Sequence, residues 1–166
     1  MNQKPPFTAI FTSPVGYLGI CLEGQKLIGL KFLGRGNPSV DVVAEESSGM
    51  NKAVNSALND YFINPRHVVQ PEIVLDGTEY QRKIWKALTQ IRSGETRTYG
   101  DIARELKTSP RAVGNACRRN PVPIFIPCHR VVPKSGGGGF MGHTTGEPLA
   151  IKKWLLGHEQ EAAADD

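Results

Sequence analysis

The stretch YGDIARELKTSPRAVGNACRRN, residues 99–120, decides the fold of the second half of the chain. It contains two short helical patterns around KTSP. Each pattern has an apolar stripe: Ile102, Ala103 and Leu106 in the first, Val113, Ala116 and Cys117 in the second. Two short helices joined by a tight turn predict a helix-turn-helix. On the second helix, Arg111, Asn115 and Arg118 share the face opposite the apolar stripe, where they are available to phosphates or bases.

The next stretch, PVPIFIPCHRVVP at residues 121–133, is apolar and rich in proline. Its prolines exclude a regular helix and cannot donate hydrogen bonds to a sheet. A segment of this kind holds the backbone on one rigid path. The two reactive residues that it holds are Cys128 and His129, side by side.

Cys128 and His129 form a candidate nucleophile and base. Cysteine reacts as the thiolate, and an apolar neighbourhood raises the thiol pKa above its usual value of about 8.5, so Cys128 needs a base. His129 is the candidate, but adjacent side chains in an extended chain point to opposite sides, which favours a bridging water over a direct hydrogen bond. Glu159 is one of few acidic residues in the second half that could return to orient the imidazole.

A free cysteine is more often a small buried hydrophobe than a nucleophile, and for Cys128 this alternative stays open on the residues alone. We expect it to describe Cys117, on an apolar helical stripe, and Cys21, in a short strand. Three cysteines without CxxC spacing argue against a disulfide framework or a cysteine-rich zinc site.

Charge is concentrated in one part of the chain. Residues 81–134 carry twelve Lys/Arg and three Asp/Glu, a net charge of +9, whereas the whole chain is only +4. A local excess of this size indicates a surface that binds a polyanion such as nucleic acid. A basic face that is merely solvated is the alternative.

The remaining sequence predicts two domains, residues 1–75 and 76–166. Residues 7–33 read as short antiparallel strands, residues 41–62 as an amphipathic helix and residues 68–75 as a further strand. Asp76 and Gly77 mark the boundary. Residues 78–91 and 149–159 read as helices, and the second of these has Ile151, Trp154, Leu155 and His158 on one stripe.

The chain has no apolar run of the roughly 20 residues needed to span a bilayer. The N-terminal MNQKPPFTAI lacks the basic start and long apolar stretch of a signal peptide. We therefore expect a cytoplasmic protein.

The motif IPCHRVV, residues 126–132, closely resembles the active-site signature of the O6-alkylguanine-DNA alkyltransferase family. YQRKIWKAL, GETRTYGDIA, RAVGNACRRNPVPIFIPCHRVV and KKWLLGHE also follow the order and spacing of that family. The resemblance is specific from about residue 78 to 159 and weaker over residues 1–75. It implies an α/β (α+β) fold: a ribonuclease H-like N-terminal domain with a three-stranded antiparallel sheet and a helix, then a mostly helical, winged helix-turn-helix-like domain that binds DNA and accepts the alkyl group.

The resemblance also implies a function. Such a protein rotates O6-alkylguanine, or O4-alkylthymine, out of the duplex and transfers the alkyl group once to its own cysteine, as a monomer without cofactor or metal. Residues are carried over as follows: Cys128 as acceptor, His129 as base through a water, Glu159 as its orienting carboxylate, Asn120 as the brace of the turn, and Tyr99 as the residue that helps rotate the nucleotide and protonates the departing guanine.

The resemblance assigns the helix-turn-helix to the minor groove, with Arg111 filling the space of the rotated base. The DNA-binding set is Arg111, Tyr99, Ala112, Asn115, Ala116, Arg118 and Arg119. The substrate pocket set is Val131, Phe140 and Met141. The family usually has Gly-Tyr-(Ser/Ala)-Gly-Gly in the loop after the active site, whereas this chain has GGFMGHTTGEP, so Met141 brings no hydroxyl to the O6 atom.

Three other functions compete with alkyl transfer. A non-catalytic protein that binds alkylated DNA and flags lesions would lack the acceptor cysteine, which is present here. A helix-turn-helix transcription regulator would leave PCHR unexplained. A cysteine hydrolase would need an oxyanion hole and would turn over repeatedly.

Overall fold

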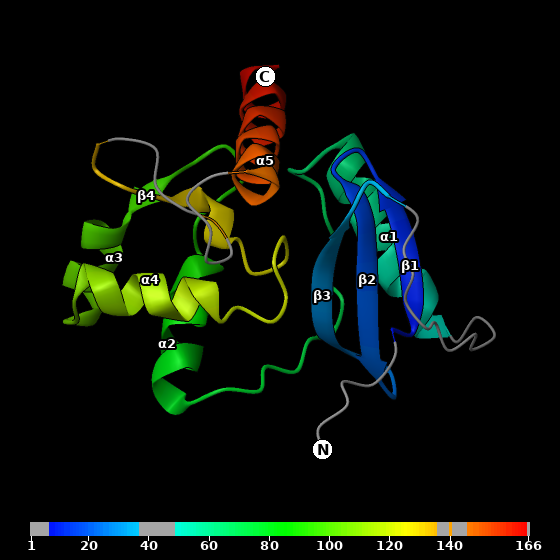
Figure 1. Ribbon diagram of the computed structural model, residues 1–166, viewed down its shortest axis with the longest axis horizontal. Coiled ribbons are helices and arrows are strands. Elements are labelled where there is room, and N and C mark those ends of the chain that lie inside the picture. Colours follow the sequence, from blue (N-terminus) through cyan, green and yellow to red (C-terminus); the bar gives the residue numbers. More distant parts are fainter. Residues whose placement is uncertain (1–6, 37–48, 136–139, 141–145, 166) are drawn as a thin grey trace. The chain divides into compact units, whose positions relative to one another are not determined.

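The computed structural model describes residues 7–36, 49–135, 140 and 146–165 (Figure 1). The chain divides into two compact units, Met1–Leu75 and Asp76–Asp166. None of the described helices is both long and apolar enough to cross a membrane. The mixed α/β architecture with a three-stranded antiparallel sheet confirms the predicted fold class.

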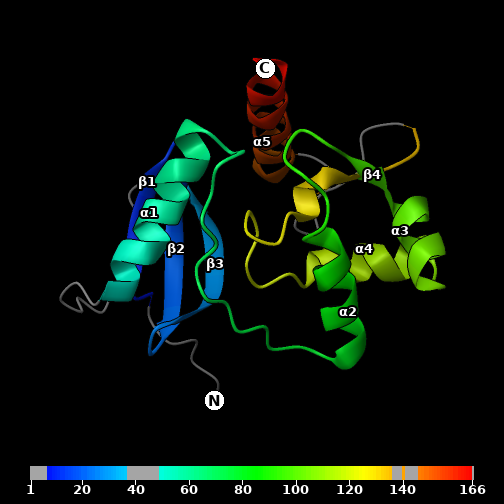
Figure 2. The ribbon, with the colours of Figure 1, turned by 180° about the vertical axis from the view of Figure 1, so that it is seen from behind.

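The first unit is a three-stranded sheet with one helix. The strands β1 (Ala9–Ser13), β2 (Gly16–Glu23) and β3 (Lys26–Gly34) pair antiparallel in chain order. Helix α1 (Gly49–Ile63) lies along this sheet, as the view from behind shows (Figure 2). Their shared core is fully buried and apolar: Leu18, Ile20, Leu27, Leu30, Val54 and Leu58. Burial of this apolar surface is the main force that holds the helix to the sheet.

The strand predicted over residues 68–75 is wrong. Only an isolated bridge forms there, between Ile73 and Leu27. The N–H of Leu27 donates to the carbonyl of Glu72 at 2.9 Å, and the N–H of Val74 donates to the carbonyl of Leu27 at 3.0 Å. Pro71, directly before this bridge, has no N–H with which to continue the ladder. The helix predicted over residues 41–62 is α1 from Gly49, and residues 41–48 lie outside the described residues.

The second unit is mostly helical. Its elements are α2 (Glu79–Leu88), β4 (Arg97–Thr98), α3 (Tyr99–Leu106), α4 (Pro110–Arg118), the 3₁₀ turn η1 (Cys128–Arg130), β5 (Val131–Val132) and α5 (Glu147–Ala164). Trp85 of α2 is buried and donates its indole N–H to the carbonyl of Ala116 at 2.8 Å. This contact fixes α2 against α4, because an unpaired indole N–H would be costly at such a depth.

The local sequence sets the limits of α3 and α4. Thr98 caps α3 through a capping box, in which its hydroxyl accepts from the Asp101 N–H and its own N–H donates to the Asp101 carboxylate. Lys107 ends α3 in the left-handed conformation, with a φ of 56°. Ser109 caps α4, and Pro110 occupies its first turn. The predicted helix-turn-helix thus rests on two caps and one left-handed residue.

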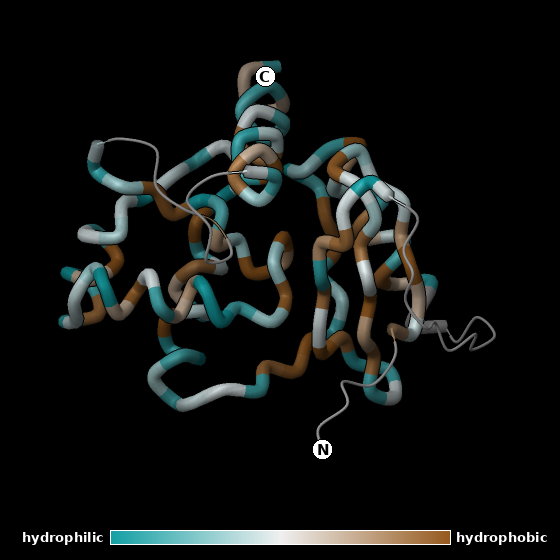
Figure 3. Tube along the Cα trace, viewed as in Figure 1, coloured by the Kyte–Doolittle hydropathy of each residue, from teal (hydrophilic) through white to brown (hydrophobic). Residues whose placement is uncertain are grey.

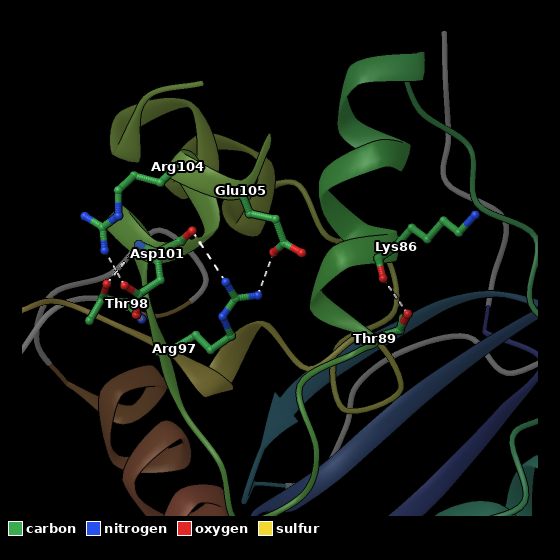
Figure 4. A network of polar contacts seen from close by, with 7 residues as sticks. All are labelled: Lys86, Thr89, Arg97, Thr98, Asp101, Arg104 and Glu105. Carbon is green, nitrogen blue, oxygen red and sulfur yellow. Dashed lines mark hydrogen bonds and ion pairs between the residues drawn. The ribbon is translucent and has the colours of Figure 1, made fainter. Parts of the chain in front are cut away.

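A short parallel strand pair forms where the sequence predicts no strand. Arg97 and Thr98 of β4 pair with Val131 and Val132 of β5. Figure 4 shows Arg97 reaching Glu105 of α3, with the guanidinium 2.7 Å from the carboxylate. Because β5 directly follows η1 and β4 directly precedes α3, this pairing holds the end of η1 beside the start of α3.

Of the stripe predicted for helix α5, Ile151 and Leu155 are buried, whereas Trp154 and His158 are not. The buried residues are Ile151, Lys152, Leu155 and Glu159, two of them ionisable. Trp154 and His158 are half-buried, and their rings stack with centroids 4.8 Å apart. The predicted stripe left out Lys152 and Glu159, because the burial of these two charges depends on partners inside the unit.

Candidate active site

The turn before Cys128 is folded by its own backbone. The N–H of Ile126 donates to the carbonyl of Val122 at 3.0 Å, and the N–H of Cys128 donates to the carbonyl of Ile126 at 2.8 Å. Ile124 has a φ of 75°, which is unusual for a β-branched residue. The surrounding contacts therefore hold this turn in one conformation.

Asn120 joins the two ends of this turn. Its side-chain N–H donates to the carbonyl of Ile126 at 2.8 Å, while its side-chain oxygen accepts from the N–H of Val122 at 3.0 Å. Asn120 is only 4 % exposed, so both bonds are shielded from water. An aspartate could not donate the first bond, which explains why this position suits an amide.

Cys128 begins η1 and is 3 % exposed. Burial raises the pKa of its thiol to about 11, although a hydrogen bond from Asn120 and the charge of Lys152 act in the opposite direction. The resting side chain is therefore a protonated thiol, and its reactivity depends on a base. All three cysteines are among the described residues, and none forms a disulfide.

His129 is fully buried and contacts Glu159 of α5, 30 residues away in the sequence. Its Nε2 lies 2.8 Å and 3.0 Å from the two carboxylate oxygens. An ionised carboxylate only accepts hydrogen bonds, so Nε2 carries the proton. Nδ1 then carries the lone pair, and among the described residues it has no hydrogen-bond partner. Desolvation lowers the pKa of His129 despite the bond to Glu159, which leaves a neutral imidazole with one accepting nitrogen.

Arg130 is a member of this cluster that the sequence reasoning missed. Its Nε donates to both carboxylate oxygens of Glu159 at 2.7 Å and 3.0 Å, and its Nη1 donates to the carbonyl of Ile91 at 2.6 Å. Burial alone would raise the pKa of Glu159, but the hydrogen bonds from His129 and Arg130, together with the charge of the guanidinium, hold it at about 2. Glu159 is therefore ionised although it is only 1 % exposed.

Lys152 is the second residue that was missed. It is 3 % exposed, its Nζ donates to the carbonyl of Val131 at 2.8 Å, and it lies 6.0 Å from the ring centre of Tyr99. Burial lowers the pKa of Lys152 and raises that of Tyr99 to about 12. The signal for Lys152 was its spacing, because it lies three and seven residues before Leu155 and Glu159 on one helical face.

The predicted DNA-binding residues fall into two groups. Arg111, Asn115, Arg118 and Arg119 are exposed, and Ala112 is half-buried. Ala116 is different: it is 3 % exposed and lies on the core stripe of α4, three residues after Val113. Ala112 and Ala116 were predicted to permit close approach of the helix to DNA because they are small and apolar, and this stays a prediction. Figure 3 shows that hydrophilic and hydrophobic residues alternate along the trace of α4.

The predicted pocket residues Val131 and Phe140 are both buried, at 0 % and 4 % exposure. Met141 lies outside the described residues. Over the described ranges, no group of three His, Cys, Asp or Glu side chains is arranged to hold a metal ion.

The chain resembles proteins of one family along nearly its whole length. Residues 79–161 match the family model described as 6-O-methylguanine DNA methyltransferase, DNA binding domain. A probable methylated-DNA–protein-cysteine methyltransferase of Acanthamoeba polyphaga mimivirus is 39% identical over 156 residues, which cover 92% of this chain and 95% of the relative. The methylated-DNA–protein-cysteine methyltransferase of Methanosarcina acetivorans is 36% identical, covering 90% and 96%.

Solved structures give the same result. The crystal structure of Mycobacterium tuberculosis O6-methylguanine methyltransferase superposes with a TM-score of 0.75 and 31% identity, covering 95% of this chain and 94% of that one. The crystal structure of M. tuberculosis OGT in complex with DNA has a TM-score of 0.73 and 34% identity, with 92% of each chain covered. The chain belongs to the O6-methylguanine DNA methyltransferase family.

Proposed function

We propose that this protein is a single-turnover DNA repair enzyme, a methylated-DNA–[protein]-cysteine S-methyltransferase. It transfers the alkyl group of O6-alkylguanine, and of O4-alkylthymine, from DNA to Sγ of Cys128. The observation that carries the proposal is the buried base beside the buried thiol: His129 has Nε2 bonded to Glu159 and Nδ1 as the remaining acceptor. Membership of the family and the names of its relatives support the same reaction.

The first step is proton transfer from the thiol. At neutral pH Cys128 is protonated, His129 is neutral and Glu159 is ionised. The proton passes from Sγ to Nδ1 of His129 through a bridging water. The imidazolium that forms lies 2.8 Å from the Glu159 carboxylate, which stabilises its charge. Lys152 and the Asn120 amide are the groups that favour the thiolate.

The second step is displacement at carbon. The thiolate attacks the alkyl carbon in line, the S–C bond forms and the C–O6 bond breaks. The departing guanine takes a proton from the Tyr99 hydroxyl, which burial keeps protonated with a pKa of about 12. The His129 imidazolium returns that proton, so the thiol proton ends on guanine and no cofactor is consumed. Water does not cleave a thioether, so each molecule reacts once.

The exposed face of α4 is the proposed DNA-binding surface. Arg111, Asn115 and Arg118 project from it, and the half-buried Ala112 permits close approach to the duplex. We propose that α4 lies in the minor groove, that Arg111 fills the space of the rotated base, and that the protein acts as a cytoplasmic monomer. Val131 and Phe140 would line the guanine pocket. The unit Asp76–Asp166 contains both the DNA-binding surface and the acceptor.

A labelled-transfer assay tests the proposal. Duplex DNA with ³H-methyl on O6 of guanine is incubated with wild type, Cys128→Ala and, as a matched control in the other unit, Cys21→Ala. We expect one label per molecule of wild type and Cys21→Ala, and none on Cys128→Ala. Label on Cys128→Ala, or repeated turnover, would overturn the assignment. Tight lesion binding by wild type without label would instead identify a non-catalytic lesion-flagging protein.

A further inference from the structure

The guanidinium of Arg130 binds two separate groups, the carboxylate of Glu159 and the carbonyl of Ile91. Arg130 is only 9 % exposed, and its Nε and Nη2 both bind the Glu159 carboxylate, Nη2 at 2.6 Å from Oε1. Its Nη1 is bonded to the carbonyl of Ile91. Charge-assisted bonds of this forked kind are among the strongest and most directional in proteins.

The same carboxylate also receives Nε2 of His129. Glu159 thus lies between a guanidinium that is always charged and an imidazole that can gain a charge. With His129 neutral, the buried trio of Arg130, Glu159 and His129 has no net charge. Protonation of His129 would leave two cations on one anion.

We propose that Arg130 is a positioning residue for alkyl transfer: it balances the charge of Glu159, so that His129 stays a neutral proton acceptor, and it fixes the carboxylate against Nε2. The inference rests on the proposed function for the role of His129 as a base. The residue acts through Glu159 and touches neither the thiol nor the substrate.

The charge argument follows from what Glu159 would do alone. A buried carboxylate beside an imidazole favours the imidazolium, and an opposite charge at this distance raises a pKa by about one to three units. Arg130 opposes that effect, and the other charged group that lowers the pKa of His129 is Lys152 of α5. Cys128 of η1, Tyr99 of α3 and Cys117 of α4 have raised pKa values and are uncharged near neutral pH.

The positioning argument follows from the anchor at Ile91. The segment after α2 packs closely on α5: a Cβ added at Gly94 would lie 2.8 Å from that of Ala163 and 3.5 Å from the carbonyl oxygen of Glu159. Arg130 therefore spans two elements that are themselves in contact. A lysine has the charge but not the planar fork that reaches both groups.

Two variants of Arg130 distinguish its charge role from its positioning role. In Arg130→Gln we expect the His129 imidazole, followed by ¹⁵N NMR, to titrate about one to three units higher than in wild type. The acid limb of the single-turnover methyl-transfer rate should move up in pH by the same amount. In Arg130→Lys we expect His129 to titrate close to wild type, with transfer slowed about tenfold at every pH.

Arg97→Gln is the matched control, because Arg97 also binds a carboxylate, that of Glu105, but at the surface. It should leave the His129 titration unchanged. An unchanged titration in Arg130→Gln, or an Arg97→Gln shift of equal size, would overturn the charge role. If Arg130→Gln does not fold, Arg130→Lys still decides: wild-type rates at all pH values would overturn the positioning role. A wild type that transfers no label would refute the proposed function, yet the NMR titration would still report on Arg130 and His129.

Discussion

Two charged regions of the second unit differ in whether their charges are paired with other groups of the protein. In the buried cluster of His129, Arg130 and Glu159, the carboxylate and the guanidinium are bound to one another and to neighbouring groups. On the exposed face of α4, the side chains of Arg111 and Arg118 form no hydrogen bond or ion pair with another described residue. The two opposite charges of the cluster are paired within the protein, whereas the α4 face is available to a partner.

The difference has a physical cause. An unpaired charge inside a protein is costly, so burial is tolerated only with partners and good geometry. Water solvates an exposed arginine, and that water is readily replaced by phosphate. The cluster should therefore determine chemistry and stability, and the α4 face should determine DNA affinity. The following experiments test this division, beginning with the largest expected effect.

His129→Ala removes the proposed base but keeps both partners of the Arg130 and Glu159 pair. We expect the single-turnover rate of methyl transfer to fall by about 10²- to 10⁴-fold, the usual contribution of general base catalysis. Affinity for lesion-containing duplex, measured by fluorescence anisotropy, should stay within about twofold of wild type. A comparable loss of affinity would show that the two regions are not separate.

Acid should destabilise the cluster through Glu159. The pKa of this carboxyl falls from 4.5 to about 2 on folding, so its ionised form stabilises the native state above pH about 4.5. That stability is lost as pH falls from about 4.5 to about 2, and its size is on the order of 3 kcal/mol.

Urea unfolding between these pH values measures the loss. Glu159→Gln should be less stable at pH 7, because Arg130 loses its buried anion, and should show less pH dependence. Glu105→Gln, which breaks the exposed pair with Arg97, should change stability by no more than about 1 kcal/mol. Equal effects of the two variants would contradict the distinction between buried and exposed pairs.

Arg111→Ala should slow alkyl transfer from duplex DNA but not from a free base. If Arg111 fills the space of the rotated base, its loss should slow transfer from duplex by roughly tenfold or more, equivalent to about 1–3 kcal/mol. Reaction with O6-benzylguanine as a free base should keep its wild-type rate, because no base has to be rotated. Equal slowing of both reactions would place Arg111 in the chemistry instead.

Arg118→Gln should have the smallest effect. The variant removes one positive charge, so the dependence of log affinity on log salt should become shallower by about one unit. Lys26→Gln in the first unit, which lies in an exposed pair with Glu72, is the charge-matched control and should leave the slope unchanged. A slope that does not respond to Arg118 would remove this residue from the DNA surface.

The local parts of the fold were accessible from the sequence. The apolar stripe of Val54, Ala57, Leu58 and Tyr61 predicts α1, and all four are buried. The two stripes around KTSP predict α3 and α4 for the same reason: periodicity and caps are properties of neighbouring residues. The short β4 and β5 strands were missed because two residues carry no periodicity of their own.

The site was only partly accessible in this way. Cys128 and His129 stand out as neighbours in the sequence, and Glu159 was a candidate because few acidic residues lie in the second half. Arg130 and Lys152 were missed, since in sequence they look like solvent-exposed cations. Their burial depends on partners far along the chain: Glu159 is 29 residues from Arg130, and Val131 is 21 residues from Lys152.

The sequence by itself determined the helices, the proline-rich turn and the basic character of residues 81–134, and it singled out Cys128 as the candidate nucleophile. The tertiary structure alone decided which charges are buried, that Ala116 faces the core, and that Nε2 of His129 is bonded while Nδ1 is the remaining acceptor. The physical reason is the difference in sequence separation between the interacting residues. Helix formation depends on residues three or four apart, whereas the state of a buried charge depends on whichever group the fold brings to it.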